Sequence, residues 1–438
     1  MNKAQLIIFG SIGAIVVLAL AVILGVLPGL KERPVRNFSL EIWGTEDSRE
    51  IWDAIINRFR EEVAKGAEIK YVKKDPRTYE EELLNALASG KGPDIFSLAD
   101  SELQTHRDKL KPLIEGELEY ERKNLKTIFA DGLTQAIADD AGALFGTPLA
   151  FDTLALFYNR DYLNAANIPS PPQTWDELLE QSRLLTKFSS AGGITRSGVA
   201  LGTALNVAHA PDILLALILQ SGETILTADS SGRGRSALQS EKTASALSFY
   251  TSFADTAKRT YAWNAFFEDS LAAFAKGDAV MAFGYAKDAK RVRELNPQLN
   301  FDTAPLPQVS RESPQVNLGR FSIFAVSRTT KEPENAWRFL LWLQGKDVEK
   351  TYIDLAGLPP ARRDLAVAKP PREYLIPFYD QVLSARTIPI ILDGSFEAIF
   401  NDMIEAVATR RFSAAQALSR AASAINDILR TQGEPKAQ

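Results

Sequence analysis

The hydrophobic pattern divides the chain into an apolar N-terminal run and a long remainder in which polar and apolar positions alternate. Residues 4–30 contain no charged side chain. A helix over residues 4–27 would be about 36 Å long at about 1.5 Å per residue, and the hydrocarbon core of a bilayer is about 30 Å thick. Pro28-Gly29 would end this helix. The pattern therefore predicts a transmembrane anchor with a short linker over residues 1–36.

A cleaved secretory signal is the alternative interpretation of this run. Such signals have a shorter apolar core, of about 7–15 residues, followed by small residues at the cleavage site. Ala19-Leu20-Ala21 matches that A-x-A pattern, but the residues after it stay apolar, so cleavage there would leave an apolar terminus. We therefore favour an uncleaved anchor. The flanking charges do not decide its orientation, because large domains cross membranes with little regard to them.

Beyond the anchor, short alternating runs are separated by amphipathic stretches. Apolar residues alternate over residues 38–43 and 67–71, which predicts two strands, and a third is predicted over 94–98. The helices between them would begin at Asp47, as an N-cap, and at Thr78, in a capping box. Strands that alternate with helices indicate a parallel sheet covered by helices. Ligands of such sheets bind at the carboxyl ends of the strands.

A second α/β set is predicted from about Phe151 onward. It includes a helix opened by a capping box of Thr174 and Glu177. A continuous apolar strand over residues 279–283 is followed by the turn Gly284-Tyr285. A chain of 438 residues exceeds one ordinary hydrophobic core, so we expect two lobes.

Composition narrows the classes of function. A formal charge of −5 argues against a nucleic-acid-binding protein, which needs a basic surface. The chain has no cysteine, which excludes disulfides, zinc-thiolate sites and cysteine nucleophiles. His106 and His209 are its two histidines, which is few for a histidine metal site and argues against a Ser-His-Asp triad. No hydrolase, zincin or P-loop motif occurs. We expect no enzyme activity, no cofactor and no bound metal.

Several short phrases follow one another in a fixed order along the chain. They are Gly90-x-Gly92-Pro93-Asp94-Ile95, Gly146-Thr147-Pro148, Leu156-Phe157-Tyr158-Asn159-Arg160-Asp161, Thr174-Trp175-Asp176-Glu177-Leu178, Phe274-Ala275-Lys276-Gly277-Asp278-Ala279-Val280-Met281, Ala336-Trp337-Arg338-Phe339-Leu340 and Gly357-Leu358-Pro359-Pro360-Ala361-Arg362. Each one alone suits many helices and turns. The ordered set resembles the extracellular solute-binding proteins of the maltose-binding-protein-like family, the receptors of ABC sugar importers.

The resemblance implies an α/β, two-lobed, periplasmic-binding-protein-like type II fold with a hinge between the lobes, preceded by the N-terminal transmembrane helix. Strand crossings are expected near residues 149–153 and 321–327. The first lobe would comprise residues 38–149 plus 327–372, and the second 150–326 plus 373–438. The implied partners are a sugar or oligosaccharide, ABC permease subunits and, through the anchor, the membrane. The body would be a monomer outside the cytoplasm.

The expected ligand contacts combine aromatic faces, which stack on sugar rings, with carboxylates, amides and cations, which bind polar groups. The candidates at predicted strand ends and crossings are Trp43, Glu46, Asp100, Asp152, Trp263, Asn264, Tyr285 and Arg320. Tyr285 occupies the position where the family often carries a stacking tryptophan. Trp43 and Tyr285 could instead belong to the core. Arg320 would suit an anionic group.

The chain departs from the family pattern in two ways. The lipid-anchoring cysteine is missing, and the apolar helix would replace it as the tether. Leu98-Ala99-Asp100 also lacks the aromatic residue that maltose binders carry there, so maltose is not the expected ligand. The leading hypothesis is a membrane-tethered receptor that captures a small carbohydrate for an ABC importer. The alternatives are a ligand-free interaction or sensory module on the same fold and, less favoured, a carbohydrate-active enzyme.

Overall fold

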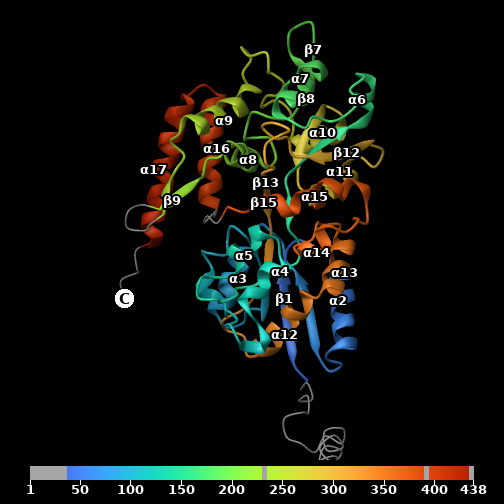
Figure 1. The fold of residues 1–438 in the computed structure, drawn as a ribbon, viewed down its shortest axis with the longest axis vertical. Coiled ribbons are helices and arrows are strands. Elements are labelled where there is room, and N and C mark those ends of the chain that lie inside the picture. Colours follow the sequence, from blue (N-terminus) through green and yellow to red (C-terminus); the bar gives the residue numbers. More distant parts are fainter. Residues whose placement is uncertain (1–36, 229–233, 389–393, 434–438) are drawn as a thin grey trace, which may run out of the picture.

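The computed structural model describes residues 37–228, 234–388 and 394–433 as two α/β lobes stacked end to end (Figure 1). The anchor expected over residues 1–36 lies outside this part of the chain. Within it, no helix combines the length and the apolar character needed to cross a bilayer.

The first lobe is built on a five-stranded sheet in the order β2-β1-β3-β14-β4. Its strands are β1 (Ser39–Gly44), β2 (Glu68–Lys73), β3 (Ile95–Ala99), β4 (Thr147–Pro148) and β14 (Ser322–Val326). The strands β1, β2 and β3 are parallel, as predicted. Their helices are α2 (Arg49–Glu62), α3 (Tyr79–Ala88), α4 (Arg122–Ile128), α5 (Asp131–Ile137), α12 (Pro333–Leu343), α13 (Lys346–Ala356) and α14 (Arg363–Ala366). Strand β1 begins at the edge farthest from the second lobe, and its carboxyl end points toward that lobe (Figure 1).

The second lobe contains a five-stranded sheet in the order β12-β6-β11-β8-β7. Its strands are β6 (Ala155–Asn159), β7 (Lys187–Phe188), β8 (Ile194–Val199), β11 (Ala279–Gly284) and β12 (Phe301–Pro305). Its helices are α6 (Arg160–Ala165), α7 (Trp175–Leu185), α8 (Ala210–Gln220), α10 (Ser270–Lys276), α11 (Ala286–Leu295) and α15 (Ile376–Gln381). Every residue of β11 is buried, as its apolar sequence predicts.

The C-terminal helices α16 (Gly394–Ala408) and α17 (Ala414–Gly433) pack on each other and against the second lobe (Figure 1). They contact α9 (Glu241–Ser252), and α17 also contacts the hairpin of β9 (Leu226–Ala228) and β10 (Gly234–Ser236).

Three chain crossings join the lobes, two of them along strands of a small sheet, β15-β13-β5, and the third between α14 and α15. The strands of this small sheet are β5 (Asp152–Thr153), β13 (Asn317–Arg320) and β15 (Ala385–Arg386). The first crossing runs from β4 through β5 to β6, within the expected segment. The second differs from the expectation. The predicted boundary after residue 326 places β14 in the second lobe, whereas β14 pairs with β3 and β4 of the first sheet. The chain therefore changes sheet between Arg320 and Ser322.

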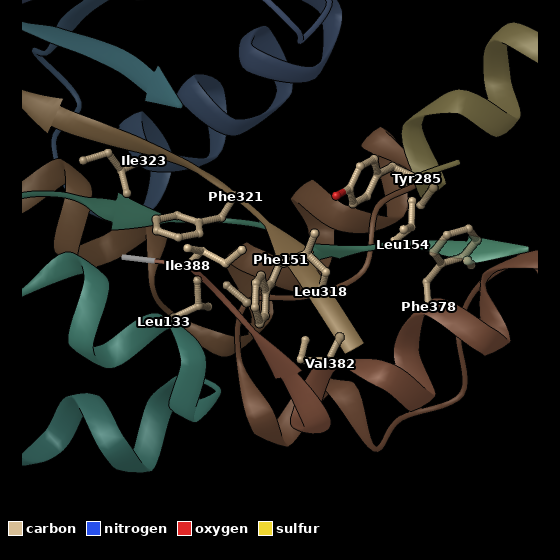
Figure 2. Close-up of a cluster of buried hydrophobic side chains, with 14 of the residues drawn as sticks. Leu133, Phe151, Leu154, Tyr285, Leu318, Phe321, Ile323, Phe378, Val382 and Ile388 are labelled. Carbon is tan, nitrogen blue, oxygen red and sulfur yellow. The ribbon is translucent and has the colours of Figure 1, made fainter. Parts of the chain in front are cut away.

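The crossing segments share a hydrophobic core, in which Phe151, Leu318 and Phe321 lie close together (Figure 2). The rings of Phe151 and Phe321 pack edge to face, with their centroids 6.3 Å apart. Gly319 is required at this point, because a Cβ there would lie 2.2 Å from the Phe151 ring. The hinge is thus tightly packed rather than a loose linker.

The helix caps test the local predictions. Thr174 caps α7 as expected, since its hydroxyl accepts a hydrogen bond from the Glu177 amide at 3.2 Å. The prediction for Asp47 is wrong: Ser48 is the N-cap of α2, and the buried Asp47 carboxylate accepts from the Trp52 indole at 2.9 Å. The capping box at Thr78 is also wrong, because the Thr78 hydroxyl bonds the Glu82 side chain instead.

Candidate functional site: the cleft between the lobes

A cavity of about 300 Å³ lies where the two lobes meet. The first lobe contributes the carboxyl ends of β1 and β3, including Thr45 and Asp100. The second contributes the start of α8 and the turn after β11, including Asp212 and Tyr285. Parallel strands bring their carboxyl ends to one edge of a sheet, which is why loops from distant parts of the chain converge here.

Five of the eight predicted contact residues line this cavity: Glu46, Asp100, Asp152, Tyr285 and Arg320. They come from both lobes and from the hinge strands β5 and β13. The strand-end argument therefore brings these side chains together. Their contact with a ligand stays a prediction.

The other three predicted residues lie elsewhere. Trp43 is on β1, where its indole donates to Glu41 at 2.6 Å and Lys74 covers its ring. Trp263 is fully buried, and its indole donates to the Asn206 side chain at 3.0 Å. Asn264 donates to the Tyr261 hydroxyl at 3.0 Å. None of the three is among the residues that line the cavity.

Arg320 is the centre of a charged network on the cavity wall. Its Nη1 lies 3.3 Å from Asp100 Oδ2, and its Nε and Nη2 face the two oxygens of Asp212, with Nε at 3.3 Å from Oδ2. The Tyr285 hydroxyl donates to Asp212 Oδ2 at 2.7 Å. Tyr285 is thus buried within this network and presents no open ring face, since 2% of it is exposed.

The two carboxylates of this network respond differently to their surroundings. Burial raises the pKa of Asp100, and Arg320 opposes this only in part. Burial also acts against ionisation of Asp212, but the attraction of Arg320 and His209, together with the hydrogen bonds from Arg320 and Tyr285, outweighs burial and lowers the pKa of Asp212. Asp212 is therefore the carboxylate that the guanidinium holds ionised.

Asp152 positions the helix that borders the cavity. Its oxygens accept from the backbone amides of Ala286, at 2.9 Å, and Lys287, at 3.2 Å, which are the first residues of α11. Burial raises the pKa of Asp152 to about 7, although these amides act in the opposite direction. The Lys287 ammonium then reaches across the cleft to Glu46 Oε1 at 3.0 Å. This ion pair connects the second lobe to the first.

Sequence reasoning missed several polar residues at the cavity, among them His209, Asp212 and Lys287. His209 Nε2 lies 2.8 Å from Asp288 Oδ2, next to the Tyr285 ring. Asp212 carried a usable signal, since it is the only charged residue in the apolar helix α8. A carboxylate in such a helix requires a partner, and Arg320 supplies it.

The first lobe adds a set of hydroxyl groups to the cavity wall, from Thr45, Ser97, Ser101 and Ser322. The strand register places Ser97 and Ser322 on the same face of the β3–β14 pair, because Ser97 opposes Phe324 and Ser322 opposes Ala99. Tyr79 engages Ser97, whose carbonyl accepts from the Tyr79 hydroxyl at 2.8 Å, whereas no described residue pairs with the hydroxyl of Thr45, Ser101 or Ser322. The cavity thus offers hydrogen-bonding groups that the protein leaves available.

A family profile described as "Bacterial extracellular solute-binding protein" matches residues 54–374. A binding protein of Brucella abortus is 24% identical over 230 residues, which cover 51% of this chain and 52% of that protein. The maltodextrin-binding protein MdxE of Bacillus subtilis is 25% identical over 264 residues, 58% of this chain and 56% of that protein. The chain thus spans about half the length of the curated relatives it matches.

Solved structures resemble the fold over almost the whole described chain. The cyclic alpha-maltosyl-1,6-maltose binding protein of Arthrobacter globiformis has a TM-score of 0.75 at 19% identity and covers 90% of this chain and 99% of its own. A solute-binding protein of Thermotoga lettingae bound with alpha-D-tagatose has a TM-score of 0.68 at 21% identity, with 89% and 99% covered. At these identities the likeness shows the two-lobed fold.

Proposed function

The chain belongs to the bacterial extracellular solute-binding protein family, and on this premise we propose that it captures a small carbohydrate between its lobes and delivers it to an ABC importer. The observation that carries the proposal is the cavity of about 300 Å³ lined by polar groups from both lobes. A solute there touches both lobes only when they are closed, so binding and closure are coupled. The volume is at the lower end of ligand sites and suits one or two sugar rings.

The groups on the cavity wall support a carbohydrate. Hydroxyls both donate and accept hydrogen bonds, and carboxylates accept two each, which matches the vicinal hydroxyls of a sugar. Relatives named for maltodextrin and galactooligosaccharide binding support the same class. Within this proposal the contacts are made by Glu46, Asp100, Asp152, Tyr285 and Arg320. These relatives are binding proteins, and we propose no catalysis.

The proposal also covers the arrangement of the whole chain. The lobes would comprise residues 38–149 with the segment from β14 to residue 372, and residues 150–320 with 373–438. The apolar run of residues 4–30 would tether a monomeric body outside the cytoplasm, beside its permease subunits. Intact-mass measurement of membrane-extracted protein tests the tether, and a mature terminus between Ala19 and Lys31 contradicts it.

A thermal-shift screen over sugars, polyols, amino acids and polyamines tests the binding function. A ligand at 100 times its dissociation constant stabilises the folded state by about 2.7 kcal/mol, which a melting curve resolves. Stabilisation by a sugar supports the proposal. Stabilisation by an amino acid alone contradicts the proposal that the ligand is a carbohydrate, but it still supports a solute receptor.

A ligand-free interaction or sensory module is the second candidate. One observation favours it: Arg320 already fills part of the cavity wall with internal contacts to Asp100 and Asp212. The same screen separates the two functions, because a module of this kind is stabilised by no small solute. A screen without any hit therefore overturns the receptor.

A further inference from the structure

The charged groups around the cavity are strongly unbalanced. The carboxylates that line it are Glu46, Asp47, Asp100, Asp152, Asp212 and Glu397. The lysine and arginine side chains that line it are Lys287 and Arg320. His209, the other basic side chain there, is paired with Asp288. Even though burial raises the pKa of Asp100 and Asp152, the cavity wall holds an excess of acidic over basic groups.

Both cations are already engaged by carboxylates. Arg320 contacts Asp100 and Asp212, and Lys287 contacts Glu46 at 3.0 Å. An anionic solute would have to displace these carboxylates from their partners and would then face them at short distance. The network therefore disfavours an anionic ligand, in contrast to what Arg320 suggests when the sequence is considered alone.

Aromatic stacking is also poorly provided. The aromatic side chains that line the cavity are Tyr71, Tyr285, Phe321, Phe324, Tyr352 and Phe396, and each is less than one-tenth exposed. Their rings are packed into the lobes rather than presented as open faces. The solute must be held mainly by hydrogen bonds and charge.

An available hydroxyl points to a polar ligand independently of the charges. Ser322 lines the cavity and is half-buried, and no described residue pairs with its side-chain oxygen. A hydroxyl that becomes covered when the lobes close costs free energy unless a solute or water completes its hydrogen bonds. Thr45 and Ser101 lie on the same lobe and extend this hydroxyl wall.

We infer that the solute is a hydroxylated molecule with a protonated amine, of the size of an amino sugar; this inference rests on the proposed function. Closure over a neutral sugar would enclose uncompensated negative charge, which is unfavourable in a region of low dielectric constant. An ammonium group offsets that charge and donates three hydrogen bonds to carboxylate oxygens. The hydroxyl wall of the first lobe binds the remainder of the ring.

Isothermal titration of the full chain with matched sugars tests the inference. The probes are D-glucosamine, D-galactosamine and D-mannosamine, each beside its neutral parent hexose, with D-glucuronate as the anionic member. We expect at least one amine to bind about tenfold or more tightly than its parent, and added salt to reduce this ratio. A parent that binds as tightly as its amine, or a preference for glucuronate, overturns the inference and leaves the receptor function standing. Binding of none of these sugars overturns the inference, and the thermal-shift screen then decides separately whether the receptor function stands.

The decisive variant is Glu397→Gln. Glu397 is exposed on α16 and no described residue pairs with it. The fold therefore does not depend on the charge of Glu397. The matched control is Glu61→Gln, an exposed helical glutamate of α2 away from the cavity. We expect Glu397→Gln to weaken the best amine about threefold, a typical effect of one exposed charge, and to leave the control and the neutral parent unchanged. Equal weakening of amine and parent, or no change for either, contradicts the inference.

Discussion

Tyr285 shows how one side chain can belong to both the core and the binding site. It lines the cavity, yet its ring is buried and its hydroxyl donates to Asp212 at 2.7 Å. Tyr285→Phe removes one donor to a buried carboxylate, and we expect a loss of about 1–2 kcal/mol in the free energy of unfolding. Tyr285→Ala also leaves a cavity and should cost about 3 kcal/mol or more.

Urea denaturation of the purified body measures both effects. Tyr162→Phe is the control, because no described residue pairs with the Tyr162 hydroxyl, and it should change stability little. If Tyr285→Ala leaves the unfolding free energy unchanged but weakens sugar binding, the ring stacks on the ligand instead of supporting the lobe.

Glu349 on α13 is a fully buried carboxyl group that should govern part of the pH dependence of the free energy of unfolding. Its Oε1 accepts from the Arg362 amide at 2.9 Å, and its Oε2 has no partner among the described residues. Burial raises the pKa of Glu349 from 4.5 to about 8. The folded state therefore holds this proton more tightly than the unfolded chain does. The resulting stabilisation is fully present below about pH 4.5 and is lost as the pH rises through about 8.

Glu349→Gln removes this titration, so its stability should fall less steeply than that of the natural chain between pH 5 and pH 8. The two unfolding free energies should diverge by on the order of 3 kcal/mol over this range. Urea melts at each pH measure the divergence, with Glu61→Gln as the exposed control. Parallel curves for the natural chain and Glu349→Gln would show that the carboxyl group is hydrated and ionised in the fold.

At the scale of elements, the pairing of β13 with β5 depends on the absence of a side chain at Gly319. A Cβ at this position would lie 2.2 Å from the Phe151 ring, which is fully buried and cannot move aside. We expect Gly319→Ala to lower the free energy of unfolding by about 1–3 kcal/mol. Phe151→Leu in the same chain should recover part of the loss, which a double-mutant cycle measures.

Gly234→Ala is the control for this pair, since its Cβ would meet nothing closer than 3.7 Å on the edge strand β10. A neutral Gly319→Ala would mean that the hinge core repacks freely. That result would also weaken the view of the hinge as a rigid joint.

Local pattern predicted β1, β2 and β3 of the first lobe and α7 and β11 of the second, because alternation and caps depend on near neighbours. Local pattern failed where contacts with distant segments determine the position of a residue or a strand. The sequence predicts Asp47 as a helix N-cap, but in the structure its carboxylate accepts hydrogen bonds from Trp52 and Tyr352. The place of β14 between β3 and β4 is set by sheet pairing, which leaves no mark in the β14 sequence.

At the cavity, too, some residues could be predicted from local pattern and others could not. Strand ends are readable from the amino-acid pattern, so the sequence alone places Glu46 and Asp100 at the cleft edge. Trp263 looked equally suitable, but its loop folds back and buries it beside Phe267, with the ring centroids 4.4 Å apart. Asp212 lies in a helix from another part of the chain, and only the fold brings it to Arg320.

For the whole molecule, the contacts between the lobes predict closure on binding. The Glu46–Lys287 pair bridges the cleft, but both side chains are about half exposed, and such pairs contribute about 0.2–1 kcal/mol. The pair is therefore a weak link that the contacts of Arg320 with Asp100 and Asp212 supplement, and we expect a solute bound by both lobes to add to these contacts. We expect small-angle scattering to show a smaller radius of gyration with a saturating sugar than without it. An unchanged radius with a tightly bound sugar would show that the lobes do not move.

The direction of β1 has a consequence for a body fixed to a membrane by the proposed tether. The chain enters this strand at the edge farthest from the second lobe, so the point of attachment and the mouth of the cleft lie at opposite ends of the first lobe. Residues 31–37 reach at most about 25 Å at about 3.5 Å per residue. A body held upright by this tether would keep its cleft above the membrane by the length of the first lobe, where solute arrives freely. To deliver the solute to the proposed permease in the same membrane, such a body would have to tilt, and its freedom to tilt would then limit the rate of delivery.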